Sequence, residues 1–143
     1  MPPSTDQQNI EITLPNQMGY ERIAMASAES YAKMLGLAAE RIEDLKTIVA
    51  EAVINAMQHG NKKRPDAWVK VSMTVKANTI EVTVMDQGEG FSAFLPDPNI
   101  DRIVNEQDPP VGFGTFLIRQ LADQVNIDKT ADGASIVRMT IKL

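Results

Sequence analysis

The chain of 143 residues contains no cysteine, which excludes disulfide bonds and thiolate metal sites. Its single histidine, His59, excludes metal sites built from several histidines and leaves any Ser-His-Asp triad dependent on that one residue. No apolar run approaches the roughly 18 residues of a membrane-spanning helix, and the first residues lack a charged and then apolar signal segment. We therefore expect a cytoplasmic protein that does not enter a membrane.

Basic residues are also in the minority, with 14 lysines and arginines against 19 acidic residues and a net charge of -5. This balance argues against a nucleic-acid groove, because phosphate binding favours a basic face. The length and the 43% of hydrophobic residues suit one domain with one core. We expect that domain over residues 9–143, after a polar N-terminal segment, residues 1–8, that we expect to be disordered.

Hydrophobic periodicity predicts elements in the order β-α-α-β-β-loop-α-β-β. The expected strands are 9–14, 68–75, 80–85, 125–128 and 136–141, and the expected helices are 18–35, 38–59, capped by Gly60, and 114–122. This order predicts an α+β fold, a two-layer α/β sandwich with helices on one face of a mixed, mostly antiparallel sheet. Residues 92–111 hold four of the eight prolines and read as a long functional or mobile loop.

The second expected helix carries two polar residues, Glu51 and Asn55, that are four positions apart and so share one face. The same side holds Glu40, Asp44, Thr47 and Gln58. A polar stripe of this kind is most often a solvated face. In the functional interpretation, the Asn55 amide oxygen binds Mg²⁺, and Glu51 orients or deprotonates an attacking hydroxyl. His59, one turn further on, is either a capping or packing residue or a phosphate contact.

Asp86 ends an apolar, β-branched strand and is followed by Gly88 and Gly90. An aspartate before glycines is common in ordinary turns. A carboxylate at this place can also accept a hydrogen bond from an exocyclic amine, which would select adenine over guanine. The two glycines would then let the loop pass flat against the base.

Gly112 and Gly114 come just before the third expected helix. They are either a flexible hinge or a loop that brings phosphates to the helix N-terminus, where free amides and the dipole favour anions. The sequence contains no GxxxxGK[ST] pattern, so this is not a P-loop.

Taken in order, three blocks of sequence resemble the N, G1 and G2 boxes of the Bergerat-fold (GHKL) ATP-binding superfamily, whose fold is that of histidine-kinase-like ATPases. They are Glu51-Ala52-x-x-Asn55-Ala56-x-x-His59-Gly60, Asp86-x-Gly88-x-Gly90-Phe91 and Gly112-x-Gly114. The resemblance covers the chain from about Ile10 to Leu143. Within the superfamily the chain is most similar to the small bacterial anti-sigma-factor serine/threonine protein kinases.

The resemblance implies that Glu51 is the catalytic carboxylate, Asn55 the Mg²⁺ ligand and Asp86 the adenine reader, with residues 92–111 as the ATP lid. The remaining residues that it implies for ATP or ADP binding are His59, Gly88, Gly90, Gly112, Phe113, Gly114, Thr115 and Ser135. The chain also departs from the family pattern. Pro109-Pro110-Val111 stands where some relatives have an arginine, and Gly133-Ala134-Ser135 stands where relatives often have Gly-Thr.

Members of the resembled family bind a sigma factor and phosphorylate a serine on a small anti-anti-sigma protein, and they are often homodimers. The resemblance therefore implies an ATP-dependent protein-serine kinase that is also a sigma-factor antagonist. One alternative is a binding module that uses ATP or ADP only to set its shape. Another is the catalytic domain of a histidine kinase, which we rank lower because the chain's only histidine lies in the N box.

Overall fold

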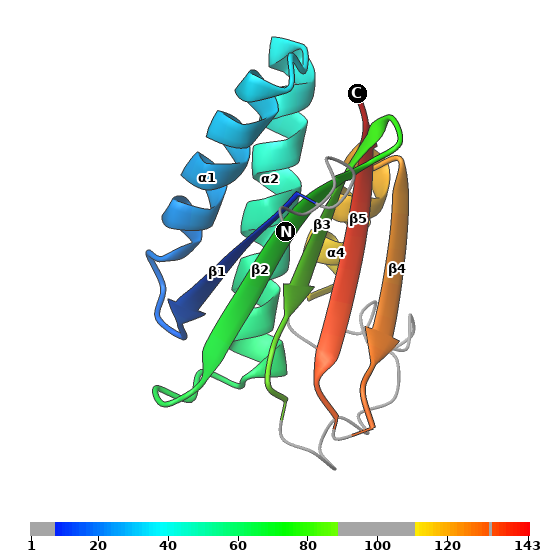
Figure 1. Ribbon diagram of the computed structural model, residues 1–143. Coiled ribbons are helices and arrows are strands. Elements are labelled where there is room, and N and C mark those ends of the chain that lie inside the picture. The colour runs from blue at the N-terminus through cyan, green and yellow to red at the C-terminus, as the bar shows by residue number, and fades with distance from the viewer. Residues whose placement is uncertain (1–7, 89–110, 132) are drawn as a thin grey trace.

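The computed structural model of the chain describes residues 8–88, 111–131 and 133–143 (Figure 1). Five strands form one sheet in the order β1-β2-β3-β5-β4. Their bounds are β1 Asn9–Pro15, β2 Trp68–Lys76, β3 Thr79–Met85, β4 Gln124–Lys129 and β5 Ser135–Lys142. All four pairings between these strands are antiparallel, so the described sheet contains no parallel pair. The α+β class and the predicted order of elements are confirmed.

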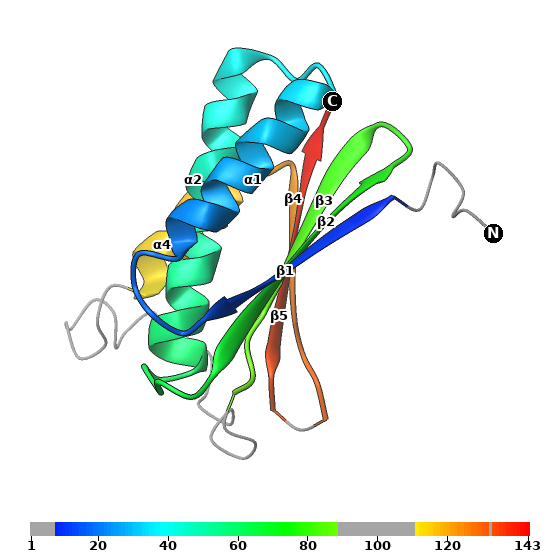
Figure 2. The ribbon, with the colours of Figure 1, turned by 60° about the vertical axis from the view of Figure 1, so that its left-hand side comes forward.

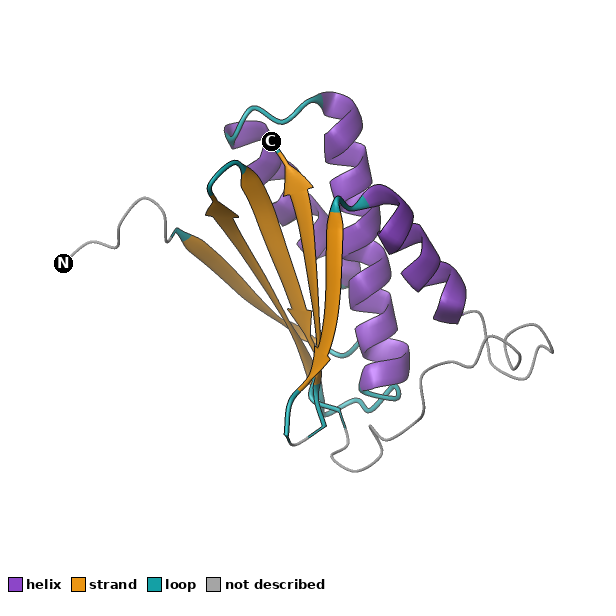
Figure 3. Ribbon diagram, turned by 90° about the vertical axis from the view of Figure 1, so that its right-hand side faces the viewer, coloured by secondary structure: helices purple, strands orange, loops and turns teal. Residues whose placement is uncertain are grey.

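Helices α1 (Glu21–Met34), α2 (Ala39–Asn55) and α4 (Val111–Leu121) all lie on one face of the sheet (Figure 2). Seen from the side, the molecule has two layers, with the other sheet face open (Figure 3). None of the helices in the described ranges is long and apolar enough to cross a membrane.

The core lies between these two layers. Along β2, the buried side chains of Val69, Val71 and Met73 alternate with more exposed ones, and β3 repeats the alternation with Ile80, Val82 and Val84. Side chains at alternate positions of a strand point to opposite faces, so these residues all reach the helical layer. There they meet Leu45, Ile48, Val49, Ala52 and Val53 of α2, Met139 and Ile141 of β5, and Ile118 of α4.

The second helix differs from its prediction at its C-terminal end. The α-helix stops at Asn55, and a π-helical turn, η2, continues it over Ala56–Gly60. The Asn61 N–H closes that turn on the Ala56 carbonyl at 2.7 Å. The expectation that Gly60 caps the helix is wrong, because Gly60 is the last residue of η2 and Asn61 is the cap. The left-handed residues are instead Lys62 and Lys63, with φ of 49° and 61°.

The third helix also begins earlier than predicted. The sequence favours a start near Gly114, because glycine is a poor helix former, but α4 begins at Val111 and includes both glycines. Helix α4 packs against α2, and such tertiary packing outweighs the intrinsic propensity of single residues. The free N–H groups of its first turn are therefore those of residues 111–114.

Arg41, near the start of α2, holds the other end of α4. Its Nη1 donates to the Leu121 carbonyl at 3.2 Å and to Asp44 at 2.8 Å. Its Nη2 donates to Asp123 Oδ2 at 2.8 Å, and that oxygen also accepts from the Lys142 N–H at 2.7 Å. The C-terminal end of α4 is thus tied both to α2 and to the end of the sheet.

Candidate functional site

The polar face of α2 divides into two parts. Near the start of the helix, Asp44 is paired with Arg41, and the Thr47 hydroxyl donates to the Glu43 carbonyl at 2.9 Å. Near the end of the helix, Glu51 and Asn55 are half-buried. Within the described part of the chain, neither of their side chains forms a hydrogen bond or an ion pair. Glu51 and Asn55 thus present a carboxylate and an amide without a partner among the described residues.

Asp86 lies just beyond the end of β3 and is only 4% exposed. Its Oδ1 accepts a hydrogen bond from the Ser135 N–H at 3.0 Å, and its own N–H donates to the Ser135 carbonyl at 3.1 Å. Burial raises the pKa of the Asp86 carboxyl above its usual range, although the N–H groups of Ser135 and Gly88 and the charges of Lys129 and Arg64 act in the opposite direction. The side chain is held in one orientation by β5.

Gly60 brings this carboxylate against the end of the α2–η2 helix. A β-carbon at position 60 would stand 1.9 Å from Asp86 Oδ2 and 2.3 Å from its carboxyl carbon. Only glycine can occupy the position without moving Asp86, and this close approach is the reason for a glycine that does not cap the helix. The first two sequence blocks therefore meet in space at Gly60 and Asp86.

Gly88 is a glycine for two reasons. Its φ is +61°, a left-handed conformation that other residues rarely adopt, and a β-carbon there would lie 2.3 Å from the Gly133 carbonyl oxygen. The loop after β3 is thereby packed against the turn between β4 and β5. In that turn the Ala134 N–H donates to the Thr130 hydroxyl at 3.0 Å.

His59 is half-buried in η2. Its pKa is lowered below the usual range, first by burial and then by the nearby charge of Lys63. A lowered pKa favours the neutral imidazole, which has one N–H group to donate. A half-buried, neutral imidazole fits a packing residue and also fits a hydrogen-bond donor to a ligand.

The G2 glycines lie in the first turn of α4, where only the backbone is described, and the side chains of Phe113 and Thr115 lie outside the description. Gly90 and the predicted lid, residues 92–111 apart from Val111, lie outside the described residues altogether, as does the predicted disordered end apart from Gln8. Ser135 is placed beside Asp86 by the two backbone hydrogen bonds given above.

Sequence reasoning missed a network of buried amides beside Asp86. Asn61 is fully buried, and its Oδ1 accepts from the Gln87 N–H at 2.8 Å. Its Nδ2 donates to the Trp68 carbonyl at 2.8 Å and to Asn16 Oδ1 at 3.2 Å. Asn16, also buried, donates through Nδ2 to the Arg64 carbonyl at 2.9 Å. The available signal was weak, because asparagines directly after Pro15 and Gly60 are typical of turns.

The described residues contain no group of three or more His, Cys, Asp or Glu side chains that could hold a metal ion by themselves. A cation such as Mg²⁺ takes one or two protein oxygens and shares its other ligands with substrate phosphates and water. The unpartnered Asn55 amide is an oxygen donor of that kind.

With this geometry in view, comparison with known proteins identifies the family. Residues 14–141 match the family described as the histidine kinase-like ATPase domain. The chain belongs to this family. The resemblance to ATP-binding proteins, seen first in three short blocks, thus extends over almost the entire chain.

Among relatives of this histidine kinase-like ATPase domain is "Serine-protein kinase RsbW" of Oceanobacillus iheyensis, 31% identical over 130 residues, which are 83% of this chain and 78% of that protein. "Serine-protein kinase RsbW" of Listeria monocytogenes is 30% identical, covering 94% of this chain and 87% of that protein. "Anti-sigma F factor" of Bacillus velezensis is 26% identical over 89% of this chain and 92% of that protein.

Two solved structures share the fold. One contains the RsbU and RsbW domains of Rv1364c from Mycobacterium tuberculosis, with a TM-score of 0.64 and 18% identity. The match covers 95% of this protein and 32% of the Mycobacterium tuberculosis chain. The other is the SiaB-SiaC complex from Pseudomonas aeruginosa, with a TM-score of 0.65, 13% identity and coverage of 96% and 90%. At these identities the likeness confirms the fold alone.

Proposed function

We propose that this chain is an ATP-dependent protein-serine kinase that also acts as an anti-sigma factor. The observation that carries the proposal is the meeting of Asp86 with Gly60, at the end of the helix that presents Glu51 and Asn55. In this proposal, the contact holds the carboxylate that would read the base at the end of the helix that carries the two proposed catalytic groups. The serine-protein kinase names of relatives at 30–31% identity support the same activity.

In this proposal Asp86 selects the base. Its buried carboxylate would accept a hydrogen bond from the exocyclic amine of adenine, while Gly88 and Gly90 let the loop pass close to the ring. GTP presents a carbonyl at the same point, so two acceptors would face each other. An unpaired buried polar group costs about 1–3 kcal/mol, and we expect ATP to be preferred over GTP by roughly tenfold or more.

The triphosphate would lie between the Asn55 face of α2 and the first turn of α4. Asn55 would hold Mg²⁺ through its amide oxygen, and the ion, when bound, supplies charge neutralisation on the phosphates. The free N–H groups at Gly112 and Gly114 would donate to phosphate oxygens, and the absence of β-carbons there allows a close approach. His59, Phe113, Thr115 and Ser135 complete the proposed ATP and ADP contacts.

Glu51 would act as the general base, one helical turn from Asn55. The serine hydroxyl oxygen of the partner attacks the γ-phosphorus, and its proton passes to the Glu51 carboxylate. The bond from the γ-phosphorus to the β–γ bridging oxygen breaks, and ADP leaves. Phosphoryl transfer depends mainly on positioning and charge neutralisation, and a general base typically adds about 10²–10⁴-fold.

The proposed macromolecular partners are a sigma factor and a small anti-anti-sigma protein, together with a second copy of this chain as a homodimer. The name "Anti-sigma F factor" of one relative supports the first of these partners. Phosphorylation of a serine on the anti-anti-sigma protein would then control release of the sigma factor. We propose neither a nucleic-acid ligand nor a membrane.

The decisive experiment is transfer of phosphate from labelled ATP to proteins captured with this chain from its native cytoplasm. We expect one small protein to be labelled on serine. Glu51→Gln should still bind ATP and transfer phosphate at least about 100-fold more slowly, because it loses basicity but keeps its size. Thr47→Ala, on the same helix face, is the control that should keep full activity.

A second candidate function is a binding module that ATP or ADP switches without phosphotransfer. It is favoured by Pro109-Pro110-Val111, which replaces the arginine of some relatives before the G2 glycines. If the wild type binds ATP and captures a partner but labels none of the partners, this second function is the correct one. If calorimetry detects no binding of ATP or of ADP to the wild type at millimolar concentration, both proposed functions are wrong.

A further inference from the structure

Three consecutive residues of the loop after β3 are each held by a different part of the protein. Asp86 is held by Ser135 of β5, through the two hydrogen bonds at 3.0 and 3.1 Å. The Gln87 N–H is held by Asn61 Oδ1 at 2.8 Å. The Gly88 carbonyl is held by Arg64 Nη2. Only the first of these anchors comes from the sheet that the loop leaves.

Arg64 joins the other two anchors. Its Nε donates to the Asn61 carbonyl at 3.1 Å while its Nη2 donates to the Gly88 carbonyl. The Arg64 backbone contacts the same group as its side chain, because the Arg64 N–H also donates to the Asn61 carbonyl, at 3.0 Å. A planar guanidinium can bind two carbonyl groups in a fixed relation in a way that a lysine ammonium cannot.

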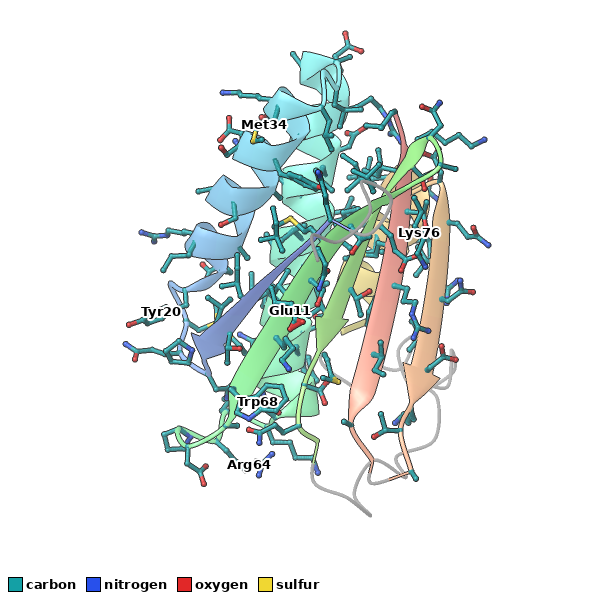
Figure 4. All side chains as sticks on the ribbon, viewed as in Figure 1. Glu11, Tyr20, Met34, Arg64, Trp68 and Lys76 are labelled. Carbon is teal, nitrogen blue, oxygen red and sulfur yellow. The ribbon has the colours of Figure 1, made fainter. Side chains whose placement is uncertain are left out.

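The loop is also held by the first residue of β2. The Gln87 side chain accepts from the Trp68 N–H at 2.8 Å, and Trp68 begins β2. Arg64 and Trp68 lie near one another at the same end of the sheet (Figure 4). Asn61 accepts from the Gln87 N–H and donates to the Trp68 carbonyl. It is fully buried, and all its side-chain polar atoms are partnered.

The helix that carries Asn55 runs directly into this arrangement. Through η2 its last turn ends at Gly60, and Asn61 follows. One π-helical turn therefore fixes where Asn61 lies in space relative to Asn55. The hydrogen bond from the Asn61 N–H to the Ala56 carbonyl closes that turn. A shift of the helix end would move Asn61, and with it the Gln87 amide next to Asp86.

We propose that Arg64 and Asn61 are positioning residues that set the base selectivity of the nucleotide site, by fixing the loop of Asp86, Gln87 and Gly88 relative to the helix that carries Asn55. In this role neither residue would need to touch the nucleotide. This role rests on the proposed function, in which Asp86 reads adenine. The positive charge of Arg64 also lowers the pKa of the Asp86 carboxyl, which favours the ionised form that accepts from an amine.

Two variants of Arg64 separate hydrogen bonding from charge. Arg64→Lys keeps the positive charge but cannot bridge the Asn61 and Gly88 carbonyls as the guanidinium does. Arg64→Met removes charge and donors together. Lys63→Met is the matched control, because it removes one charge from the same loop on an exposed side chain and leaves the Lys63 N–H bond to the Met57 carbonyl intact.

The experiment is calorimetric titration of each variant with Mg²⁺-ATP and with Mg²⁺-GTP, alone and combined with Asp86→Asn. We expect both Arg64 variants to reduce the ATP-over-GTP preference at least about threefold, the size of one net hydrogen bond. Lys63→Met should keep the wild-type preference. In the Asp86→Asn background the Arg64 substitutions should leave the preference unchanged, because the group that they position is gone.

If the Arg64 variants lose ATP affinity and GTP affinity equally, Arg64 does not set base selectivity and its role is only structural. Full wild-type preference in Arg64→Lys would overturn the positioning role too. Both results leave the proposed function standing, because the wild type still binds ATP. A wild type that binds neither nucleotide would overturn the proposed function itself, and the positioning role with it.

Discussion

The Asp86 carboxylate lies so close to the Gly60 backbone that a β-carbon at position 60 would stand 1.9 Å from its Oδ2 atom. The two residues are far apart in sequence and belong to different blocks of the family pattern. Their contact ties the end of the helix that carries Glu51 and Asn55 to the loop proposed to read the base. A substitution at Gly60 can therefore test whether this contact is part of the ATP site.

Gly60→Ala should weaken ATP binding at least about tenfold and lower the free energy of unfolding by about 1–3 kcal/mol, the usual cost of overpacking a filled core. The added methyl group has to displace a carboxylate that Ser135 holds in place. Calorimetry and urea denaturation measure the two effects. Gly36→Ala is the control, since Gly36 has φ +80° and nothing within 4 Å of the added atom. That variant should be destabilised by backbone strain and bind ATP normally, and unchanged ATP affinity in Gly60→Ala would remove the contact from the site.

The buried Asp86 should make stability depend on pH. Its pKa is raised by burial in the folded state, whereas in the unfolded chain it lies at about 3.9. Between these two values the folded state binds more protons, so the free energy of unfolding falls as pH rises, and the loss is complete above the folded pKa. Asp86→Asn lacks this loss. Urea denaturation from about pH 4 to pH 7 should therefore show the wild type losing stability relative to the variant, and a difference that is constant over the range would contradict the raised pKa.

Asn55→Ala should remove the protein's contribution to Mg²⁺ binding. Wild-type affinity for ATP should fall when Mg²⁺ is removed with a chelator, whereas the affinity of Asn55→Ala should be low with and without the cation. Calorimetry in both buffers measures the two affinities. Thr47→Ala is the comparison on the same helix face, because its hydroxyl only donates back to the Glu43 carbonyl. If Asn55→Ala keeps the full Mg²⁺ dependence, Asn55 is not the ligand.

Arg41→Ala should destabilise the fold without changing the chemistry. It removes the hydrogen bond to the Leu121 carbonyl and the ion pairs with Asp44 and Asp123. Because the side chains of both pairs are about one third exposed, the expected loss is only about 1–2 kcal/mol. Thermal denaturation against Arg22→Ala, an exposed arginine of α1, measures the loss. A melting temperature equal to that of Arg22→Ala would show that the anchor of α4 contributes nothing.

Much of this fold could be predicted from local patterns. The alternation of Val69, Val71 and Met73 predicts a strand, because successive side chains point to opposite faces. The spacing of Ile42, Leu45 and Val49 predicts a helix for the corresponding reason. The three motif blocks identified the candidate site residues because residue types and their spacing can be recognised in the sequence without knowledge of the fold. The family match over residues 14–141 confirms that these blocks belong together.

The sequence alone determined which elements form, in which order, and which residues are candidates for binding ATP. Only the tertiary structure decided that Gly60 is a close contact of Asp86, that the second helix ends in a π-helical turn, and that α4 begins at Val111. It also brought Asn16, Asn61 and Gln87 together around the proposed base-reading loop. The physical reason is the range of the interactions along the chain. Periodicity records the interactions of near neighbours, whereas these arrangements follow from packing and from the need of buried polar groups for partners far away in the chain.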